Sequence, residues 1–278
     1  MPPESEPEFE PYRERRGLFT GAAADYRLGR PGYPDAVYEL LRERGLGAGS
    51  SVLEIGPGAG QATAVLLEAG ASVTAVELGA EFAAELRSSL PGPDLTVIVG
   101  PFEDVDIVGG PFDFVVSATA FHWVPTEAGL AKAAAFLRPG GCLALWWTFF
   151  GDLSRDDPFH EAIQPLLAAA APELLLSPGS SEAAGSLPYA LDADARRGEI
   201  ARSGHFGPVH HETISWTGRH SPTEIRAMFG SFSNWLAIDA ARREPLLDQL
   251  EELAVEAFDG VVERPYQTGV YLATRAAT

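Results

Sequence analysis

The stretch VLEIGPGAGQAT spans residues 52–63 and passes from an apolar, strand-like run through three glycines into a helical pattern. Glycines at a strand-to-helix turn permit positive φ angles and let a ligand lie against the main chain, where a Cβ atom would collide with it. The stretch therefore predicts a ligand site at this turn. A tight turn that binds nothing is the alternative interpretation.

The spacing of Gly56, Gly58 and Gly60 argues against a pyrophosphate as that ligand. The pattern G-x-G-x-G is one residue shorter than the dinucleotide fingerprint G-x-G-x-x-G. The strand before the turn also carries the acidic Glu54 at its end. A carboxylate there would repel a pyrophosphate, but it would suit a cationic amino-acid moiety.

A second carboxylate ends the next strand-like run. Glu77 lies 21 residues after Gly56, where an acidic side chain can accept hydrogen bonds from both hydroxyls of a ribose. A solvated loop acid is the alternative for Glu77 taken alone. The glycine turn and Glu77 support each other and predict a ligand that contains a ribose.

Strand-like and helical segments alternate on both sides of this stretch. A helix that begins at Pro34 and stops at Gly45 precedes the first strand. Regular alternation with short turns predicts right-handed βαβ units and a parallel sheet. The expected strands are residues 51–55, 72–77, 95–99, 112–118 and 142–149, and the helices between them are residues 61–69, 81–90 and 127–137.

The pattern changes after residue 150. Residues 151–189 are rich in Ala, Pro, Ser and Gly, which indicates an insertion. Two more strands are expected, and they would close the sheet with an antiparallel pair. The expected strands are residues 210–218 and 266–274, and the expected helices are residues 158–170, 193–203, 222–236 and 244–258.

Charge and composition exclude several classes of partner. The chain of 278 residues has 20 Lys and Arg against 39 Asp and Glu, a net charge of −19. Such a surface repels nucleic acid and anionic membranes. Cys142 is the single cysteine, so no intramolecular disulfide or thiolate metal cluster can form. The acidic, proline-rich N-terminus does not resemble an export signal, and no apolar stretch is long enough to span a membrane. We expect a cytoplasmic protein.

Four motifs together resemble a class I S-adenosylmethionine-dependent methyltransferase. They are the E-x-G-x-G-x-G loop, Glu77, the segment GPFED at residues 100–104 and the segment LRPGG at residues 137–141. Three further stretches resemble a bacterial small-molecule branch of that family. These are Tyr26 with RPGYP at residues 30–34, FHW at residues 121–123 and RPY at residues 264–266.

The resemblance implies a Rossmann-like fold of the α/β class: a doubly wound, mostly parallel seven-stranded sheet with an antiparallel last strand and helical cap insertions. The implied cofactor is S-adenosylmethionine, which leaves as S-adenosylhomocysteine. The domain organisation that we expect is a disordered tail (1–16), a cofactor-binding half (17–150), two insertions that form an acceptor cap (151–190 and 221–258) and two segments that complete the sheet (191–220 and 259–278).

The resemblance also assigns cofactor contacts, position by position. The methionine and ribose parts would lie on Gly56, Gly58 and Gly60, flanked by Glu54 and Gln61. Glu77 would hold the ribose hydroxyls and Leu78 would flank the adenine. Ser117 and Ala118 would lie beside the sulfonium, and Tyr26 and Arg30 would cover the cofactor, with Arg30 facing its carboxylate. A helix-surface pair is the alternative for Tyr26 and Arg30.

One position departs from the family pattern. The residue after Gly100 is usually acidic and contacts the adenine amino group, but here it is Pro101. We therefore assign the adenine contact to Phe102 and Glu103.

The acceptor site is predicted from residues after the fourth and fifth strands. His122 follows the fourth strand at the edge where open α/β sheets bind ligands, and its ordinary pKa of about 6.5 suits a general base. A histidine that only shapes the pocket is the alternative. Aromatic side chains there would form an apolar acceptor pocket and attract a cation; they are Phe121, Trp123, Phe149 and Phe150. No metal site is expected, because His210 and His211 point to opposite faces of a strand.

The leading hypothesis is a methyltransferase that modifies O, N or C of a small, fairly apolar metabolite, as in secondary metabolism. Three alternatives remain open: cyclisation or rearrangement with the same cofactor, a nicotinamide-dependent oxidoreductase, and a protein that binds the cofactor without turnover. The oligomeric state is not predicted, although an N-terminal segment that covers a cofactor could be exchanged between subunits of a homo-oligomer.

Overall fold

The computed structural model describes residues 23–175 and 187–276. The predicted tail over residues 1–16 lies outside the described residues. No helix in the described ranges is both long enough and apolar enough to cross a lipid bilayer.

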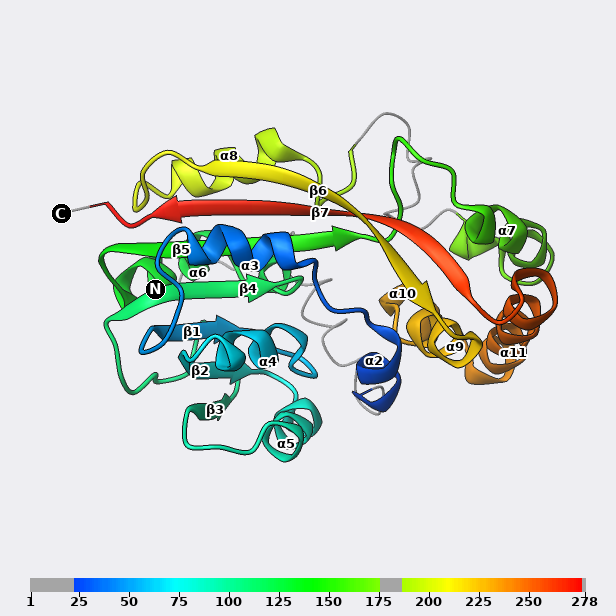
Figure 1. Ribbon diagram of the computed structural model, residues 1–278, viewed down its shortest axis with the longest axis horizontal. Coiled ribbons are helices and arrows are strands. Elements are labelled where there is room, and N and C mark those ends of the chain that lie inside the picture. The colour runs from blue at the N-terminus through cyan, green and yellow to red at the C-terminus, as the bar shows by residue number, and fades with distance from the viewer. Residues whose placement is uncertain (1–22, 176–186, 277–278) are drawn as a thin grey trace, which may run out of the picture.

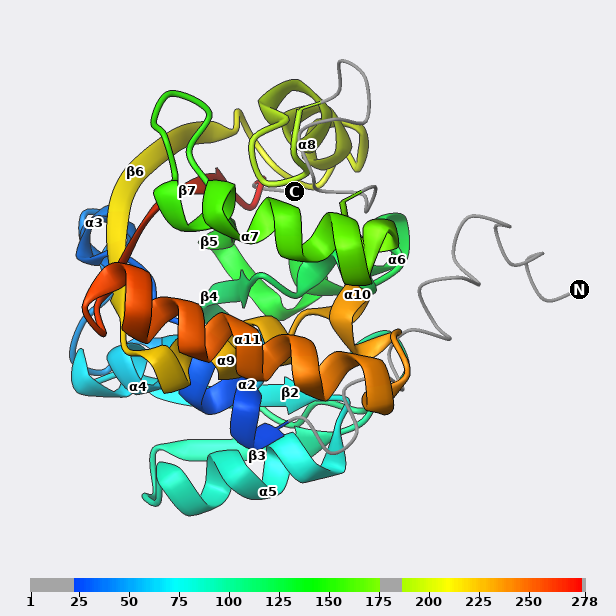
Figure 2. The same cartoon turned by 90° about the vertical axis from the view of Figure 1, so that its right-hand side faces the viewer.

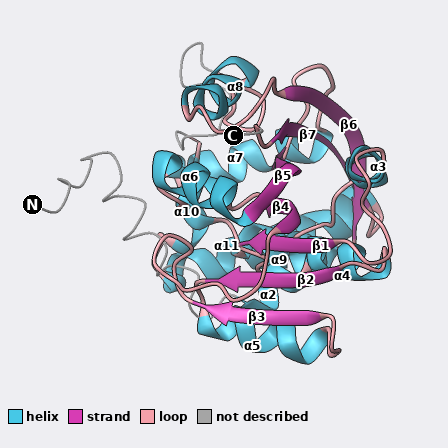
Figure 3. Ribbon diagram, turned by 90° about the vertical axis from the view of Figure 1, so that its left-hand side faces the viewer, coloured by secondary structure: helices cyan, strands magenta, loops and turns pink. Residues whose placement is uncertain are grey.

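A seven-stranded sheet forms the centre of the molecule (Figure 3). Its order is β3-β2-β1-β4-β5-β7-β6, and β7 runs antiparallel to both of its neighbours. The predicted fold class is therefore confirmed. The strands are β1 (Ser51–Ile55), β2 (Ser72–Glu77), β3 (Leu95–Val99), β4 (Phe112–Ala118), β5 (Leu137–Phe149), β6 (His210–His220) and β7 (Val262–Thr274).

Helices cover both faces of this sheet, and each face has its own apolar core. One core contains residues of α3 (Asp35–Arg42), α4 (Gln61–Glu68) and α5 (Ala80–Ser89). The other contains residues of α6 (Thr126–Phe136) and α8 (Ala193–Arg202). Because side chains alternate along a strand, β5 contributes Trp146 to the first core and Trp147 to the second.

A third layer of helices lies beyond the carboxyl ends of the parallel strands (Figures 1 and 2). It consists of α7 (Pro158–Ala170), η3 (Pro172–Leu174), α9 (Pro222–Gly230), α10 (Ser233–Leu236) and α11 (Ala240–Phe258). These helices have their own apolar core, which includes Phe159, Met228 and Tyr266. We call this layer the cap.

The first helix of the described residues, α2 (Ala23–Gly29), joins the cap to the sheet domain. A Cβ atom on Gly29 would lie 2.0 Å from the backbone nitrogen of Met228 in α9. On its other side, Tyr26 packs edge-on against Phe82 of α5, and Arg27 pairs with Glu85. Glycine at residue 29 therefore permits the close backbone contact that holds α2 in place.

Some predicted elements differ from the structure. The expected helix 222–236 is two helices, α9 and α10, with a break at residues 231–232. Helix α11 begins at Ala240, capped by the Asp239 side chain, rather than at residue 244. Sequence pattern favours the later start because Pro245 resembles a first-turn proline. The short elements α2 and η2 (Phe121–Trp123) were not predicted, since neither has an extended apolar period.

Candidate functional site

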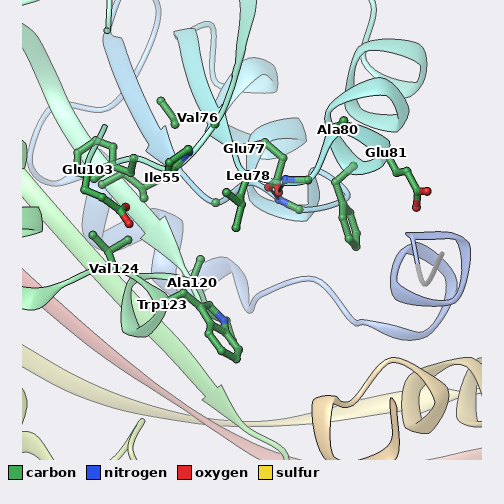
Figure 4. A pocket seen from close by; sticks show the side chains of 18 of the residues that line it. Ile55, Val76, Glu77, Leu78, Ala80, Glu81, Glu103, Ala120, Trp123 and Val124 are labelled. Carbon is green, nitrogen blue, oxygen red and sulfur yellow. Dashed lines mark hydrogen bonds between the residues drawn. The ribbon is translucent and has the colours of Figure 1, made fainter. Parts of the chain in front are cut away.

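A cavity of about 500 Å³ opens at the carboxyl ends of β1, β2, β3 and β4 (Figure 4). Its walls come from the loops that follow these four strands and from Tyr26 of α2. Loops at this edge of an open parallel sheet commonly bind ligands, because strands of one direction bring their ends together there. Seven of the predicted contact residues line it: Tyr26, Gly56, Gly58, Glu77, Leu78, Phe102 and Glu103. Trp123, predicted for the acceptor, also lines this cavity.

The glycine turn forms one wall of the cavity. Gly56, Gly58 and Gly60 have φ angles of 67°, 57° and 91°, values that favour glycine. A Cβ atom on Gly56 would lie 2.5 Å from Cβ of Ala120, so this glycine lets the loops after β1 and β4 touch. Gly60 instead faces Leu86 and caps α4. Its role here is to start the helix.

Glu77 holds the glycine turn in shape. Its Oε2 accepts a hydrogen bond from the backbone N–H of Gly58 at 3.0 Å, and Oε1 accepts one from Gly79 at 2.8 Å. Burial raises the pKa of Glu77, and these backbone hydrogen bonds act in the opposite direction. Each carboxylate oxygen can accept two bonds, so Glu77 keeps acceptor capacity for a ligand in the cavity.

Leu78, Phe102 and Glu103 also line the cavity. Leu78 is 41% exposed, which is unusual for a leucine. A ring bound in the cavity would cover this side chain. Lys132 donates hydrogen bonds to the backbone oxygens of Glu103 and Val105, which fixes the loop after β3. Figure 4 shows Glu103 on the opposite side of the cavity from Glu77 and Leu78.

Glu54 lies beneath the glycine turn and does not line the cavity. It is fully buried, and its Oε2 accepts a 2.7 Å hydrogen bond from the Thr63 hydroxyl, whereas Oε1 has no partner. Burial, the largest cause, raises the pKa of Glu54 to about 7. The carboxyl group therefore takes up a proton more readily in the folded chain than in the unfolded chain.

This shift predicts that Glu54 makes folding stability depend on pH. The folded pKa of about 7 lies above the usual 4.5, so the contribution is fully present below pH 4.5 and is lost as pH rises through 7. At about 1.4 kcal/mol per pKa unit the loss is about 3 kcal/mol. We expect Glu54→Gln to remove this pH-dependent loss of stability. The free energy of unfolding of the wild type and of Glu54→Gln, measured in urea between pH 4.5 and 8, checks this. Parallel pH profiles of the two proteins would contradict the assignment.

A second, smaller cavity of about 10 Å³ adjoins the first, because Tyr26 and Thr119 line both. Predicted residues Arg30, Gln61 and Phe150 line it. The Arg30 guanidinium lies over the rings of Tyr26, Phe150 and Phe232 and donates to the Ser231 hydroxyl at 2.8 Å. Sequence reasoning missed three of its wall residues, Tyr33, Thr119 and Thr148; their positions at strand ends and next to Arg30 were the available signal.

Seven predicted residues line neither cavity: Glu54, Gly60, Ser117, Ala118, Phe121, His122 and Phe149. Ser117 is buried and its hydroxyl donates to the backbone oxygen of Ile55. Ala118 and Phe121 belong to the two apolar cores that cover the sheet. Phe149 packs against the core that contains Trp147. These side chains support the walls from behind.

His122 also lies outside both cavities, packed against Trp123 and Tyr189 at ring distances of 4.8 and 5.7 Å. The indole N–H of Trp147 donates a 3.0 Å hydrogen bond to its Nδ1. Burial, with smaller effects from Arg196 and Arg30, lowers the pKa of His122 to about 4. A neutral imidazole whose Nδ1 accepts a bond carries its hydrogen on Nε2. In this arrangement the free nitrogen donates rather than accepts.

Comparisons with known proteins agree with this geometry. A family model for the methyltransferase domain matches residues 52–141. An uncharacterized methyltransferase of Geobacillus is 33% identical over 162 residues, 55% of this chain and 74% of its own. An uncharacterized methyltransferase of Mycobacterium tuberculosis is 27% identical over 235 residues, 84% of each chain.

Solved structures share the fold. A protein of Anabaena variabilis, provisionally assigned as a methyltransferase from an antibiotic biosynthesis pathway, has a TM-score of 0.58 at 16% identity and covers 88% of this chain and 98% of its own. Phosphoethanolamine N-methyltransferase 2 of Haemonchus contortus has a TM-score of 0.53 at 16% identity over 95% of this chain and 57% of its own.

Proposed function

Because the chain belongs to the methyltransferase family and has the class I fold, we propose that it transfers the methyl group of S-adenosylmethionine to O, N or C of a small, fairly apolar metabolite. One observation carries the proposal. The glycine turn, Glu77 and the Leu78–Phe102 end form a single cavity that adjoins a cationic one.

The described residues fit this cofactor. Glu77 has spare acceptor capacity for two ribose hydroxyls, and Leu78 and Phe102 offer apolar surface to the adenine. Gly56 and Gly58 line the cavity with backbone, against which the methionine and ribose parts would lie. Arg30 would face the carboxylate and Tyr26 would cover the cofactor. Glu54, Gly60 and Gln61 would support the turn beneath it, and Ser117 and Ala118 would back the wall near the sulfur.

The bound cofactor supplies a methyl group that its sulfonium already activates. The protein then has to align the acceptor, exclude water and accept a proton where the acceptor carries one. The cap lies over the strand ends that hold the cofactor cavity, and Phe150 on this side packs against Phe232 of the cap. We propose that Trp123 and Phe150 contact the acceptor, with Phe121 and Phe149 supporting them, and that the insertions 151–190 and 221–258 form the acceptor cap.

The choice of a small metabolite as acceptor has two supports. The net charge of −19 disfavours nucleic acid, and aromatic side chains lie at the cavities, Trp123 at the large one and Phe150 at the small one. One structural relative is named for a small molecule, phosphoethanolamine, and a second is provisionally assigned to an antibiotic biosynthesis pathway. A role in secondary metabolism follows from the second of these as a proposal.

His122 is proposed to shape the acceptor site and to donate a hydrogen bond, in place of the base role favoured by the sequence. We expect His122→Asn, which keeps an acceptor near the Trp147 N–H, to lower kcat by less than tenfold. General-base catalysis contributes typically 10²-fold or more. Loss of kcat by about 10²-fold or more in both His122→Asn and His122→Phe, with unchanged cofactor affinity, would restore the base role.

The proposed function is tested first by isothermal titration with S-adenosylmethionine, S-adenosylhomocysteine and NADPH. We expect micromolar binding of the first two and none of the third. A metabolite panel then follows, read by mass spectrometry for products heavier by one CH2. Binding of NADPH alone would overturn the cofactor assignment. A product of unchanged mass would indicate rearrangement, and cofactor binding without turnover of any acceptor would indicate a binding protein.

A further inference from the structure

Four residues that carry a hydroxyl group line the small cavity next to the glycine turn. They are Tyr26, Tyr33, Thr119 and Thr148, and Arg30 lies in the same wall. A volume of about 10 Å³ is close to the least that holds one water oxygen. Since Tyr26 and Thr119 also line the large cavity, a ligand bound there could extend a single oxygen atom into the small one.

The pair of Tyr33 and Thr119 has one hydroxyl hydrogen to spare. The Tyr33 hydroxyl donates to Oγ1 of Thr119 at 3.1 Å. Burial raises the pKa of Tyr33, so this phenol keeps its hydrogen at neutral pH. The pair holds two hydroxyl hydrogens and uses one between its members, so the hydrogen on Thr119 remains available to the cavity.

A second spare hydrogen is found on Thr148. The indole N–H of Trp216, which can only donate, gives a 2.9 Å hydrogen bond to Oγ1 of Thr268. Thr268 is fully buried, and its Oγ1 lies 2.9 Å from Oγ1 of Thr148. If Thr148 donated in this pair, the hydroxyl hydrogen of Thr268 would be buried with no acceptor among the described residues, at a cost of about 1–3 kcal/mol. Thr268 therefore donates, and Thr148 directs its hydrogen toward the cavity.

The backbone at Thr119 supports a functional position. Its φ angle is 55°, a conformation that is costly for a β-branched residue. Its N–H donates to the backbone oxygen of Trp146 at 2.7 Å. Together, the strained backbone and the hydrogen bond from Tyr33 hold the Thr119 side chain at the junction of the two cavities.

The charge in this wall indicates what the two hydrogens would meet. Within the described ranges, Arg30 has no ion pair with a carboxylate; its guanidinium contacts Ser231 and three aromatic rings. A positive charge removed from water is costly unless an anion accompanies it. The site therefore favours a negatively charged oxygen.

We propose that the hydroxyls of Thr119 and Thr148 form a two-donor site for one carboxylate oxygen beside Arg30, with Trp216 and Thr268 as positioning residues that orient the hydrogen of Thr148. This inference rests on the proposed function. The carboxylate has two possible sources with the same chemistry: the amino-acid tail of the cofactor and the acceptor.

The experiment compares two ligands by isothermal titration. S-adenosylhomocysteine has the amino-acid tail, whereas 5′-methylthioadenosine has the adenosine and sulfur without it. In Thr148→Val we expect about tenfold weaker binding of S-adenosylhomocysteine, typical of a lost charge-assisted hydrogen bond, and 5′-methylthioadenosine binding within twofold of wild type. Thr148→Ser should restore the first affinity, and Trp216→Phe should weaken it by a smaller factor. The matched control is Thr96→Val on the exposed part of β3.

A third ligand tests the other source. If Thr148→Val binds both nucleosides as wild type does, benzoate is titrated into the protein loaded with S-adenosylhomocysteine. Benzoate binding that is lost in Thr148→Val and kept in Thr148→Ser would identify the acceptor as the source. Unchanged binding of all three ligands, or equal losses for the two nucleosides, would overturn the two-donor site. Wild-type protein that binds neither nucleoside would instead overturn the proposed function.

Discussion

Glu77→Gln is expected to weaken binding of S-adenosylhomocysteine by roughly 1–3 kcal/mol, about five- to 150-fold in Kd. Glu77 accepts hydrogen bonds from the backbone N–H groups of Gly58 and Gly79. Glutamine keeps one acceptor oxygen, but its NH2 group would face one of these two N–H groups, and two donors cannot bond to each other. The substitution therefore removes a ribose acceptor and also loosens the glycine turn. Isothermal titration measures the loss directly.

Glu256→Gln on the exposed face of α11 is the matched control, since it makes the same chemical change far from the cavity. Unfolding in urea should show Glu77→Gln folded under the conditions of the titration. A folded Glu77→Gln protein with wild-type affinity would mean that the ribose lies elsewhere.

Gly29→Ala is expected to detach α2 from α9. The added Cβ atom would lie 2.0 Å from the backbone nitrogen of Met228 and 2.3 Å from the carbonyl carbon of Ala227. Backbone atoms of a packed helix cannot yield as a side chain can, so overpacking of about 1–3 kcal/mol outweighs the gain in helix propensity of about 1 kcal/mol. Tyr26 and Arg30 would lose their positions beside the cavities.

Two measurements check this expectation. Urea unfolding should show a lower free energy of unfolding, and isothermal titration should show S-adenosylhomocysteine binding weakened at least tenfold. Gly32→Ala is the control three residues away, because a Cβ atom there meets nothing within 4 Å. Greater stability and wild-type affinity in Gly29→Ala would contradict a role for the close contact between α2 and α9 in positioning Tyr26 and Arg30.

The parallel sheet, its antiparallel closing strand and the position of the large cavity were predictable because they depend on local signals. Alternating periods of two and 3.6 residues identify the βαβ units. The turn at residues 56–60 and Glu77 lie at the ends of β1 and β2, where parallel strands bring them together. These residues could therefore be assigned to one site without coordinates.

The smaller cavity was less predictable because its walls come from distant segments. Tyr33 precedes α3, Thr119 follows β4 and Thr148 lies near the end of β5. No sequence pattern shows whether a threonine at the end of a strand directs its hydroxyl hydrogen into a cavity or toward water. The same limit applies to His122, whose role depends on a hydrogen bond from Trp147, 25 residues away.

The sequence by itself determined the class of fold and the ligand turn, because these follow from backbone periodicity and from glycines whose conformations are local. The family was indicated by the resemblance of four short motifs to those of known methyltransferases. Only the tertiary structure decided that Glu54 is buried beneath the turn with a raised pKa, that His122 presents a donor, and that α2 closes on α9 through Gly29. The physical reason is that burial, hydrogen-bond direction and close backbone approach are properties of pairs of atoms from different elements, and those pairs exist only after the chain has folded.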